Sequence, residues 1–226
     1  MCGRFALFSD LEEIGKEFNI DTEGFNNRKS YNIAPGSIIA AVIFSDRKRF
    51  VPLRWGFIWS RQKNVFKPII NARAESLRLK PSFHCAFKRR RCLVLANGYF
   101  EWRVHGNQKI PYFIRLKSRL PFGFAALYES FCTDEGKELP ACAIITTEAN
   151  ELTSRIHNRM PAIIAGKDQN IWLHTEQPSY EEPFNLLKPY ESCEMEVFEV
   201  SKLVNSPRND TPEIIQPKLI HPAANM

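Results

Sequence analysis

The chain has 226 residues, 44% of them hydrophobic and 12% aromatic, so it can bury a sizeable core and falls at the upper end of single-domain lengths. A formal net charge of +6 and a pI near 9.0 favour an anionic partner such as nucleic acid. No apolar run reaches the roughly 18 residues of a membrane span and the first residues lack the pattern of a signal peptide, so we expect a cytoplasmic protein without membrane contact.

The first predicted element is a short helix. Ser9 is placed as its N-cap with Glu12 three residues later, and Leu11, Ile14 and Phe18 then recur on one face. Such an amphipathic helix packs its apolar side against the main body of the protein. A loop is expected over residues 26–36.

The rest of the chain is dominated by strand patterns rich in β-branched and aromatic residues. Strands are predicted over residues 38–44, 50–58, 92–102, 112–117, 123–130, 141–147 and 195–200. Helical patterns are shorter and fewer, over residues 83–88, 148–156 and 168–173. Without a strand-helix-strand rhythm, this order predicts an α+β fold with a mostly antiparallel, barrel-like curved sheet and a few short peripheral helices. We expect one domain over residues 1–219 and a tail over residues 220–226.

The cysteines indicate neither a metal site nor a disulfide framework. The chain has six cysteines without a Cys-x-x-Cys pair, and its five histidines have no zinc-like spacing beside them. Cys92, which precedes an apolar run, is expected to be a small core residue. We therefore expect no metal and no cofactor.

The amino terminus carries the most informative pattern. Removal of Met1 would leave Cys2 with a free α-amine beside its thiol, a pair that traps aldehydes as an imine and then as a five-membered thiazolidine. The reference pKa values, about 7.7 to 8.0 for the amine and about 8.5 for the thiol, leave both groups close to nucleophilic at neutral pH. The alternative is that Cys2 is an incidental early residue, and a retained Met1 would block the amine.

Three later segments offer partners for such chemistry. Asn71, Arg73 and Glu75 alternate after an apolar run and are expected to point to one side of an extended segment. Glu101 lies between aromatic residues, where partial desolvation would raise its pKa and suit it to proton transfer near neutrality; alternatively, it lies on an exposed strand face. His157 is suited to acid or base work, although a lone histidine is more often a surface or core residue.

Two further groups have simpler interpretations. Trp55, Phe57 and Trp59 are expected to be core or pocket wall rather than a platform for stacked bases. The basic run over residues 88–91 could follow phosphates, or could be a solvated loop or strand entry.

Six ordered segments together resemble the SOS-response-associated peptidase family along the full chain. They are residues 1–5, 31–36, 55–56, 71–75, 98–102 and 157–161. The resemblance implies a single β-rich domain with a basic channel for single-stranded DNA and an active site around the N-terminal cysteine, acting on abasic sites. The partner that it implies is single-stranded DNA containing abasic sites, and we expect a monomer.

The resemblance also implies residue roles. Cys2 matches the nucleophile, Asn71 a residue that orients the sugar and the cysteine, Glu101 the carboxylate that assists imine chemistry, and His157 the group that assists opening of the sugar ring. Phosphate contacts and channel lining are implied for five residues: Arg4, Arg73 and Arg159 as phosphate-binding arginines, and Asn32 and Trp102 as channel residues. One departure is Met160, which stands where the family can have a second basic residue.

Two other function classes remain open at this point. An N-terminal-nucleophile peptidase or amidase uses the same residue types for acyl transfer, and turnover of added peptides would identify it. A single-strand-binding module without chemistry would bind intact and abasic strands equally and form no covalent product.

Overall fold

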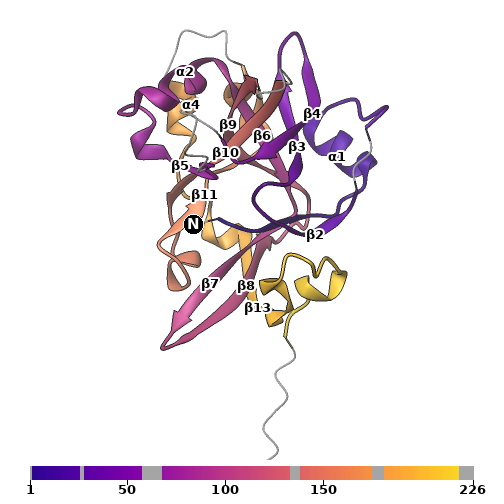
Figure 1. Cartoon of the computed structure of the whole chain (residues 1–226), viewed down its shortest axis with the longest axis vertical. Helices are drawn as coiled ribbons and strands as arrows, with labels where there is room; N and C mark the ends of the chain where they lie inside the picture. The colour runs from indigo at the N-terminus through magenta and orange to yellow at the C-terminus, as the bar shows by residue number, and fades with distance from the viewer. Residues whose placement is uncertain (1, 26–27, 58–67, 133–137, 175–180, 219–226) are drawn as a thin grey trace, which may run out of the picture.

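The structure is a computed structural model that describes residues 2–25, 28–57, 68–132, 138–174 and 181–218. Two mostly antiparallel sheets, with short helices at the periphery, make up the fold (Figure 1). The predicted α+β class with a curved, barrel-like sheet is therefore confirmed. Among the described residues, no helix is both long and apolar enough to cross a membrane.

The first sheet has five strands in the order β13-β8-β7-β1-β2. These strands are β1 (Phe5–Leu7), β2 (Ser30–Ile33), β7 (Gly98–His105), β8 (Gln108–Leu116) and β13 (Met195–Glu199). All its pairings are antiparallel. The amino-terminal strand β1 is thus held between two neighbours, β2 and β7.

The second sheet has eight strands and closes on itself. It contains β3 (Ile38–Phe44), β4 (Lys48–Trp55), β5 (Asn71–Arg73), β6 (Arg91–Ala96), β9 (Phe122–Cys132), β10 (Glu138–Glu148), β11 (Arg159–Pro161) and β12 (Ile163–Ile164). Because β9 pairs with both β6 and β10, the strands β10, β4, β3, β6 and β9 form a ring. Only β4 and β5 run parallel to β10 among the pairings of the described strands.

The helices are short and lie outside the sheets. They are α1 (Leu11–Phe18), α2 (Pro81–Arg89), α3 (Gln169–Leu173) and α4 (Glu181–Asn185), with 3-10 turns at Ala74–Ser76, Thr153–Arg155, Gly166–Asp168, Ser192–Glu194, Lys202–Asn205 and Pro212–Ile215. The predicted first helix is confirmed, and it buries Ile14 and Phe18. Its N-cap is Asp10 and not Ser9, because the Asp10 carboxylate accepts a hydrogen bond from the Glu13 backbone N–H.

The predicted strand over residues 92–102 is in fact two strands in different sheets. The break is at Asn97, whose side-chain oxygen accepts hydrogen bonds from the backbone N–H groups of Phe8 and Ser9. The next residue, Gly98, begins β7 in a crowded position: a Cβ there would lie 2.4 Å from Phe113 Cζ and 2.8 Å from the Ile114 carbonyl oxygen. The chain therefore crosses from the ring to the five-stranded sheet where only glycine fits.

Other expectations need smaller corrections. The predicted helix over residues 148–156 is wrong: Glu148 ends β10, and the segment contains only the 3-10 turn Thr153–Arg155, because the Asn150 side chain caps Thr153. The predicted loop over residues 26–36 contains β2. The predicted strand over residues 38–44 coincides with β3, and the remaining predicted strands and helices exist with shifted ends. Residues 58 and 59 and the expected tail over residues 220–226 lie outside the described residues.

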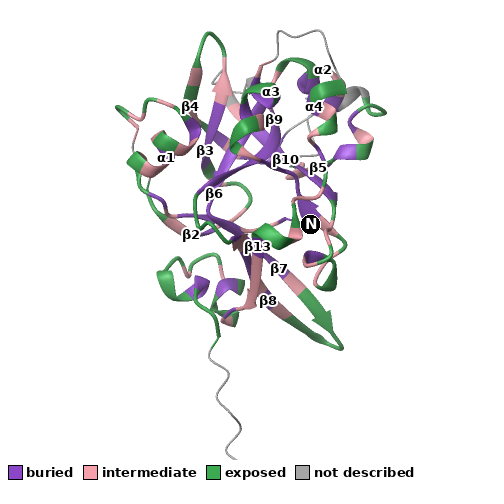
Figure 2. Ribbon diagram, turned by 180° about the vertical axis from the view of Figure 1, so that it is seen from behind, coloured by how far each residue is buried: buried purple, intermediate pink, exposed green. Residues whose placement is uncertain are grey.

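Figure 2 shows that the buried residues follow the strands of both sheets. Trp55, Phe57 and Cys92 are fully buried, as expected of core residues. Arg91 from the basic run is also buried, and its guanidinium donates to the carbonyl oxygens of Trp172, Phe87 and His174. This arginine fastens α2 and α3 to the end of β6, so it is no solvated loop residue.

Candidate active site

Cys2 lies in a fully buried position at the entrance to β1. Asn71 at the start of β5 donates a hydrogen bond from Nδ2 to the Cys2 carbonyl oxygen at 2.8 Å. The Phe100 backbone N–H donates to the Arg4 carbonyl oxygen at 2.9 Å, which holds the following residues of β1 against β7. The first residues of the chain are thus fixed by both sheets.

Glu101 lies on the side of the five-stranded sheet that packs around Cys2, together with Phe5 and Tyr99. The register pairs Phe5 with Tyr99, and side chains on a strand alternate, so Tyr99 and Glu101 share one side of β7 with Phe5. We call this side the site face. Glu101 is 5% exposed, so the alternative of an exposed strand face is wrong.

The charges of this cluster interact. Burial raises the pKa of the Glu101 carboxyl, as expected from the sequence, while nearby positive charges including that of His157 act in the opposite direction. Burial and then the charge of Glu101 raise the pKa of the Cys2 thiol, partly offset by the Arg4 backbone N–H. Burial, Cys2 and Glu101 likewise raise the pKa of the Tyr99 hydroxyl. The expectation of a thiol close to ionisation at neutral pH needs correction, because burial and Glu101 move the pKa of Cys2 upward.

Two buried polar atoms beside Cys2 have no hydrogen-bond partner among the described residues. They are Oδ1 of Asn71 and the hydroxyl oxygen of Tyr99. Leaving a buried polar atom unsatisfied costs about 1–3 kcal/mol, so such atoms in a folded protein call for an explanation. Sequence reasoning missed Tyr99, although its spacing of two residues from Glu101 on a strand was a usable signal.

His157 is held in a defined orientation between the turn Thr153–Arg155 and β11. The Arg159 backbone N–H donates to Nδ1 of His157 at 3.0 Å, and the Arg159 carbonyl oxygen lies 3.3 Å from the same atom. Because the backbone N–H can only donate, the neutral ring carries its proton on Nε2. The neighbouring Met160 is fully buried, so its side chain faces the core rather than a ligand.

The side chain of Arg159 is bound by protein groups. Its Nη1 and Nη2 atoms lie 2.8 and 3.0 Å from the two carboxylate oxygens of Glu75, and Nη2 also donates to the Thr146 carbonyl oxygen at 2.5 Å. The hydrogen bond from Arg159 lowers the pKa of Glu75 despite its partial burial. Glu75 belongs to the turn Ala74–Ser76 and not to an extended segment with Asn71, which corrects the predicted alternation, while Arg73 is exposed at the end of β5.

The opposite side of the five-stranded sheet carries Arg4, expected to bind a phosphate, and Asn32 and Trp102, expected to line a DNA channel. Arg4, Phe100 and Trp102 alternate with the residues of the site face, and the Arg4 guanidinium lies 6.0 Å from the centre of the Trp102 ring. We call this side the C-terminal face. Asn32, 4% exposed, accepts a hydrogen bond from Arg4 Nη1 at 2.6 Å.

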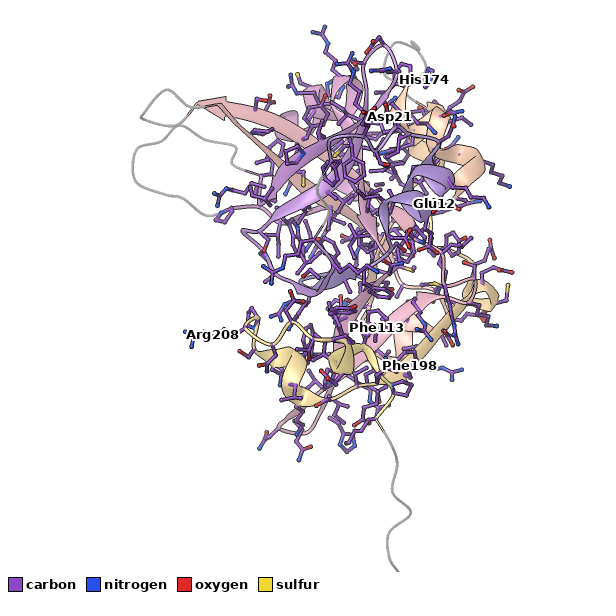
Figure 3. The ribbon with its side chains drawn as sticks, turned by 90° about the vertical axis from the view of Figure 1, so that its right-hand side faces the viewer. Glu12, Asp21, Phe113, His174, Phe198 and Arg208 are labelled. Atoms are coloured by element: carbon purple, nitrogen blue, oxygen red, sulfur yellow. The ribbon has the colours of Figure 1, made fainter. Side chains whose placement is uncertain are left out.

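Residues 201–217 cover the C-terminal face. Asn32 Nδ2 donates to the carbonyl oxygens of Ser206 and Asn209, and Trp102 Nε1 donates to Asn205 Oδ1 at 2.8 Å. Aromatic rings of the same face extend the contact, and Figure 3 shows Phe113 and Phe198 close together beside this segment, with ring centres 5.9 Å apart. The structure therefore separates these residues from Cys2, Asn71, Glu101 and His157.

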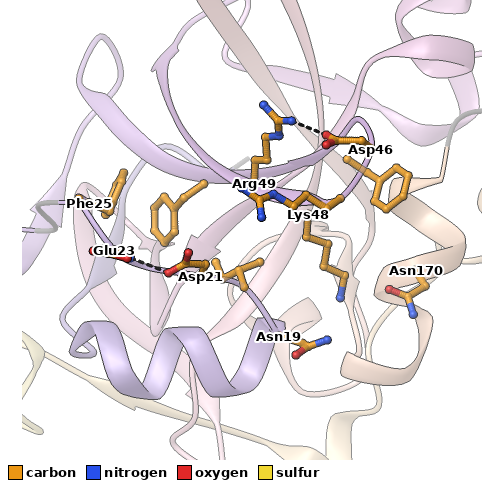
Figure 4. A pocket seen from close by; sticks show the side chains of 13 residues that line it. Asn19, Asp21, Glu23, Phe25, Asp46, Lys48, Arg49 and Asn170 are labelled. Carbon is orange, nitrogen blue, oxygen red and sulfur yellow. Dashed lines mark hydrogen bonds and ion pairs between the residues drawn. The ribbon is translucent and has the colours of Figure 1, made fainter.

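A polar cavity of about 650 Å³ lies away from both faces, between α1 and the β3–β4 turn. In Figure 4, Arg49 is bound to Asp46 at this cavity. The Lys48 amine donates to the Phe18 carbonyl oxygen at 3.0 Å. None of the predicted site residues lines this cavity.

Over the described part of the chain, no cluster of three or more His, Cys, Asp or Glu side chains could hold a metal ion.

The chain is similar to characterised proteins over nearly its whole length. Residues 1–207 match the family model described as SOS response associated peptidase (SRAP). The abasic site processing proteins YoqW and YoaM of Bacillus subtilis are 43% and 41% identical to it, over 96% and 95% of this chain and 99% and 97% of theirs. The abasic site processing protein HMCES of Gallus gallus is 30% identical, over 84% of this chain and 66% of that protein.

Solved structures share the fold. A protein from Bacteroides thetaiotaomicron superposes with a TM-score of 0.84 at 29% identity, covering 96% of this chain and 100% of the other. A phage-related protein from Bordetella bronchiseptica gives a TM-score of 0.73 at 22% identity, over 89% of this chain and 95% of the other, and supports the fold alone.

Proposed function

The chain belongs to the SOS response associated peptidase family, and from this premise we propose that it processes abasic sites in single-stranded DNA by forming a covalent bond through Cys2. The relatives are named for abasic site processing, and the chain is basic enough to favour a DNA partner. The observation that carries the proposal is the position of Cys2, buried beside Asn71 and within the electrostatic reach of Glu101.

The reaction begins with opening of the abasic sugar. In its closed form the deoxyribose is a hemiacetal, and transfer of a proton to the ring oxygen releases the aldehyde while the anomeric hydroxyl loses its proton. His157 suits the first transfer, because its Nδ1 is held by the Arg159 backbone and Nε2 is the nitrogen that carries the mobile proton.

The amine then attacks. Once Met1 is removed, the Cys2 nitrogen adds to the aldehyde carbon to give a carbinolamine. A protonated acid must deliver a proton to the departing hydroxyl so that water leaves and the imine forms. Glu101 suits this role, because burial raises its pKa and keeps a larger protonated fraction at higher pH than in an exposed glutamate.

Ring closure uses the thiol. The Cys2 sulfur bonds to the imine carbon, its proton leaves, and the imine nitrogen gains a proton to become a secondary amine, so the net products are a thiazolidine and water. The raised pKa of this thiol favours attack by the amine before the sulfur. The Glu101 carboxylate, which has just given up its proton, is the nearby base that takes the proton from sulfur.

Other groups hold the substrate. Asn71 Oδ1 faces no described partner and is available to orient the sugar or the new amine. Arg73 is exposed beside it and suits a flanking phosphate. Arg159 can bind a phosphate only if Glu75 gives up its two contacts, so we assign it first to fixing His157. The position of β1 is held by Arg4, Asn32 and Trp102. We further propose that the protein is a monomer that acts on DNA in the cytoplasm.

The test is incubation of the purified protein with a single-stranded oligonucleotide that carries one abasic site. We expect a species of slower mobility on a denaturing gel and an intact mass that equals protein plus oligonucleotide minus one water, with Met1 absent. The Cys2→Ala variant should give no stable product, whereas Cys193→Ala, at an exposed cysteine elsewhere, should react like the parent. Equal crosslinking by Cys2→Ala and the parent would rule the mechanism out.

A further inference from the structure

The β7–β8 hairpin extends beyond the body of the molecule on the strand that carries Glu101 (Figure 1). Its turn is tight, with Gly106 at φ 57°, and Figure 2 shows the outer half of the hairpin as exposed. Val104 near its end is 66% exposed, although large apolar side chains elsewhere in these strands are mostly buried.

The pairing register places Arg103 and Tyr112 of this arm on the site face. Side chains alternate along β7, so Arg103 lies on the same side as Glu101, about 7 Å further along the strand. Cross-strand pairing places Tyr112 of β8 directly opposite Glu101. The active-site side of the sheet therefore continues outward as Arg103 and Tyr112.

These two residues form a cationic and aromatic pair open to solvent. The Arg103 guanidinium lies 5.5 Å from the centre of the Tyr112 ring, Arg103 is exposed, and Tyr112 is partly exposed. From Trp102 to Ile110 the chain has no acidic residue and includes Arg103 and Lys109. Unlike Arg90, Arg115 and Arg159, Arg103 has no ion pair with any described residue.

We propose that Arg103 and Tyr112 form a binding site for the nucleotide next to the abasic position, with the guanidinium on its phosphate and the ring against its base. This inference rests on the proposed function and adds to it a specific surface. Arginine with an aromatic ring is the combination that binds single strands without sequence preference, because every base offers a face for stacking and every nucleotide a charge.

Binding is measured separately from chemistry, by fluorescence anisotropy with an intact single-stranded oligonucleotide at several salt concentrations. The variants are Arg103→Glu and Tyr112→Leu, with Arg47→Glu at the exposed β3–β4 turn as a control for the same charge change. We expect Arg103→Glu and Tyr112→Leu each to weaken binding by about tenfold. For Arg103→Glu, the slope of log affinity against log salt should become shallower by about 0.7, the value for one lost phosphate contact. Arg47→Glu should stay within about twofold of the parent.

Two outcomes would overturn the proposal: an affinity loss no larger in Arg103→Glu than in Arg47→Glu, or an unchanged salt slope in Arg103→Glu. The variants Arg103→Glu and Arg47→Glu must first show the unfolding midpoint of the parent. If charge reversal disturbs the hairpin, Arg103→Gln provides a milder substitution. Crosslinking of abasic DNA should be unchanged in Arg47→Glu, the control at the exposed β3–β4 turn. If the parent binds intact strands through the hairpin but forms no crosslink, the proposed chemistry fails while this surface stands.

Discussion

The two sides of the five-stranded sheet have opposite characters although they share the same strands. On the site face, Cys2, Tyr99 and Glu101 are buried, two polar atoms lack described partners, and the pKa values of all three groups are raised. On the C-terminal face, Asn32 accepts a hydrogen bond from Arg4 and donates to the carbonyl oxygens of Ser206 and Asn209. An apolar cluster that includes Phe100 and Phe113 packs under residues 201–217.

This difference indicates a division of labour. The C-terminal face stabilises the sheet, because its polar groups find partners within the protein and its apolar groups are covered. On the site face, polar and ionisable groups are buried at a cost in free energy. A functional site tolerates this cost when a substrate supplies the missing hydrogen-bond partners. Substitutions on one side should therefore act mainly on reaction rate, and those on the other mainly on stability.

The largest expected effect is on the site face. Glu101→Gln removes the proton donor and acceptor without changing the shape of the side chain, so the rate of crosslinking should fall by about 10²–10⁴-fold. Rapid-quench gels with an abasic oligonucleotide measure this rate. Glu196→Gln on β13, a carboxylate that pairs with Arg115 away from Cys2, is the control and should keep the parental rate. A rate loss of less than about threefold in Glu101→Gln would remove Glu101 from the mechanism.

The same variant should be more stable than the parent at neutral pH. Burial raises the pKa of Glu101 in the folded protein, so the folded state disfavours the ionised form. That penalty is absent below the unfolded pKa of about 4.3 and develops as pH rises through the higher folded pKa. The stability gain of Glu101→Gln should therefore be present at pH 8 and vanish near pH 4, as measured by urea unfolding at both pH values. An equal gain at both would contradict the sign of the shift.

On the C-terminal face the expected effect is a loss of stability. Asn32→Ala leaves Arg4 Nη1 without one acceptor and the carbonyl oxygens of Ser206 and Asn209 without a donor. The free energy of unfolding should fall by about 2–4 kcal/mol in urea titrations. Asn205→Ala, which removes only the hydrogen bond to Trp102, should cost about 1 kcal/mol. The fraction that remains folded should crosslink at the parental rate, and a rate defect in that fraction would place Asn32 in the reaction itself.

Glu75 tests how firmly Arg159 must be held. Glu75→Gln keeps one oxygen acceptor but loses the two-point contact, so the Arg159 backbone that orients His157 loses a support, and crosslinking should slow by about tenfold. Because the Glu75 side chain is 54% exposed, stability should change by less than about 1 kcal/mol. Glu129→Gln, which breaks the comparable pair with Arg90, is the matched control. Equal rates in the two variants would make Glu75 an ordinary surface partner.

The smallest expected effect is a gain. Tyr99→Phe removes a buried hydroxyl that has no described partner and keeps the ring that packs against Phe124, so the free energy of unfolding should rise by up to about 1 kcal/mol. Thermal unfolding by circular dichroism measures this. Tyr112→Phe, at a partly exposed tyrosine, should leave the midpoint unchanged. A destabilised Tyr99→Phe would show that the hydroxyl has a partner, such as an ordered water, in solution.

The sequence predicted the parts of this structure that depend on local pattern. Alternating and continuous apolar runs gave most strands of both sheets, and the 3.6-residue period gave α1. Local pattern predicts one strand over residues 92–102 because the run is mostly apolar, and nothing local shows that Asn97 is used by Phe8 and Ser9, nearly ninety residues away in the sequence.

The same limit applies to the site. Residue type and resemblance predict site roles for Cys2, Asn71, Glu101 and His157. In the structure these four residues lie close together. Arg4 and Trp102 were nominated on the same grounds but lie on the other side of the sheet. Which side a strand residue faces depends on register, and a shift of one residue reverses it. Register is fixed here by long-range pairing, such as Phe5 with Tyr99, which no short motif contains.

Gly98 makes the geometry of the proposed active site sensitive to substitution, although this residue contributes no side chain to the proposed reaction. A side chain there would collide with Phe113 and with the Ile114 carbonyl, pushing β7 away from β8. Since β1 pairs with β7 at Gly98 and Tyr99, such a shift would move the segment after Cys2 and the strand bearing Glu101 at once. A random mutagenesis screen for inactive variants should therefore recover substitutions of this glycine alongside those of the reacting residues.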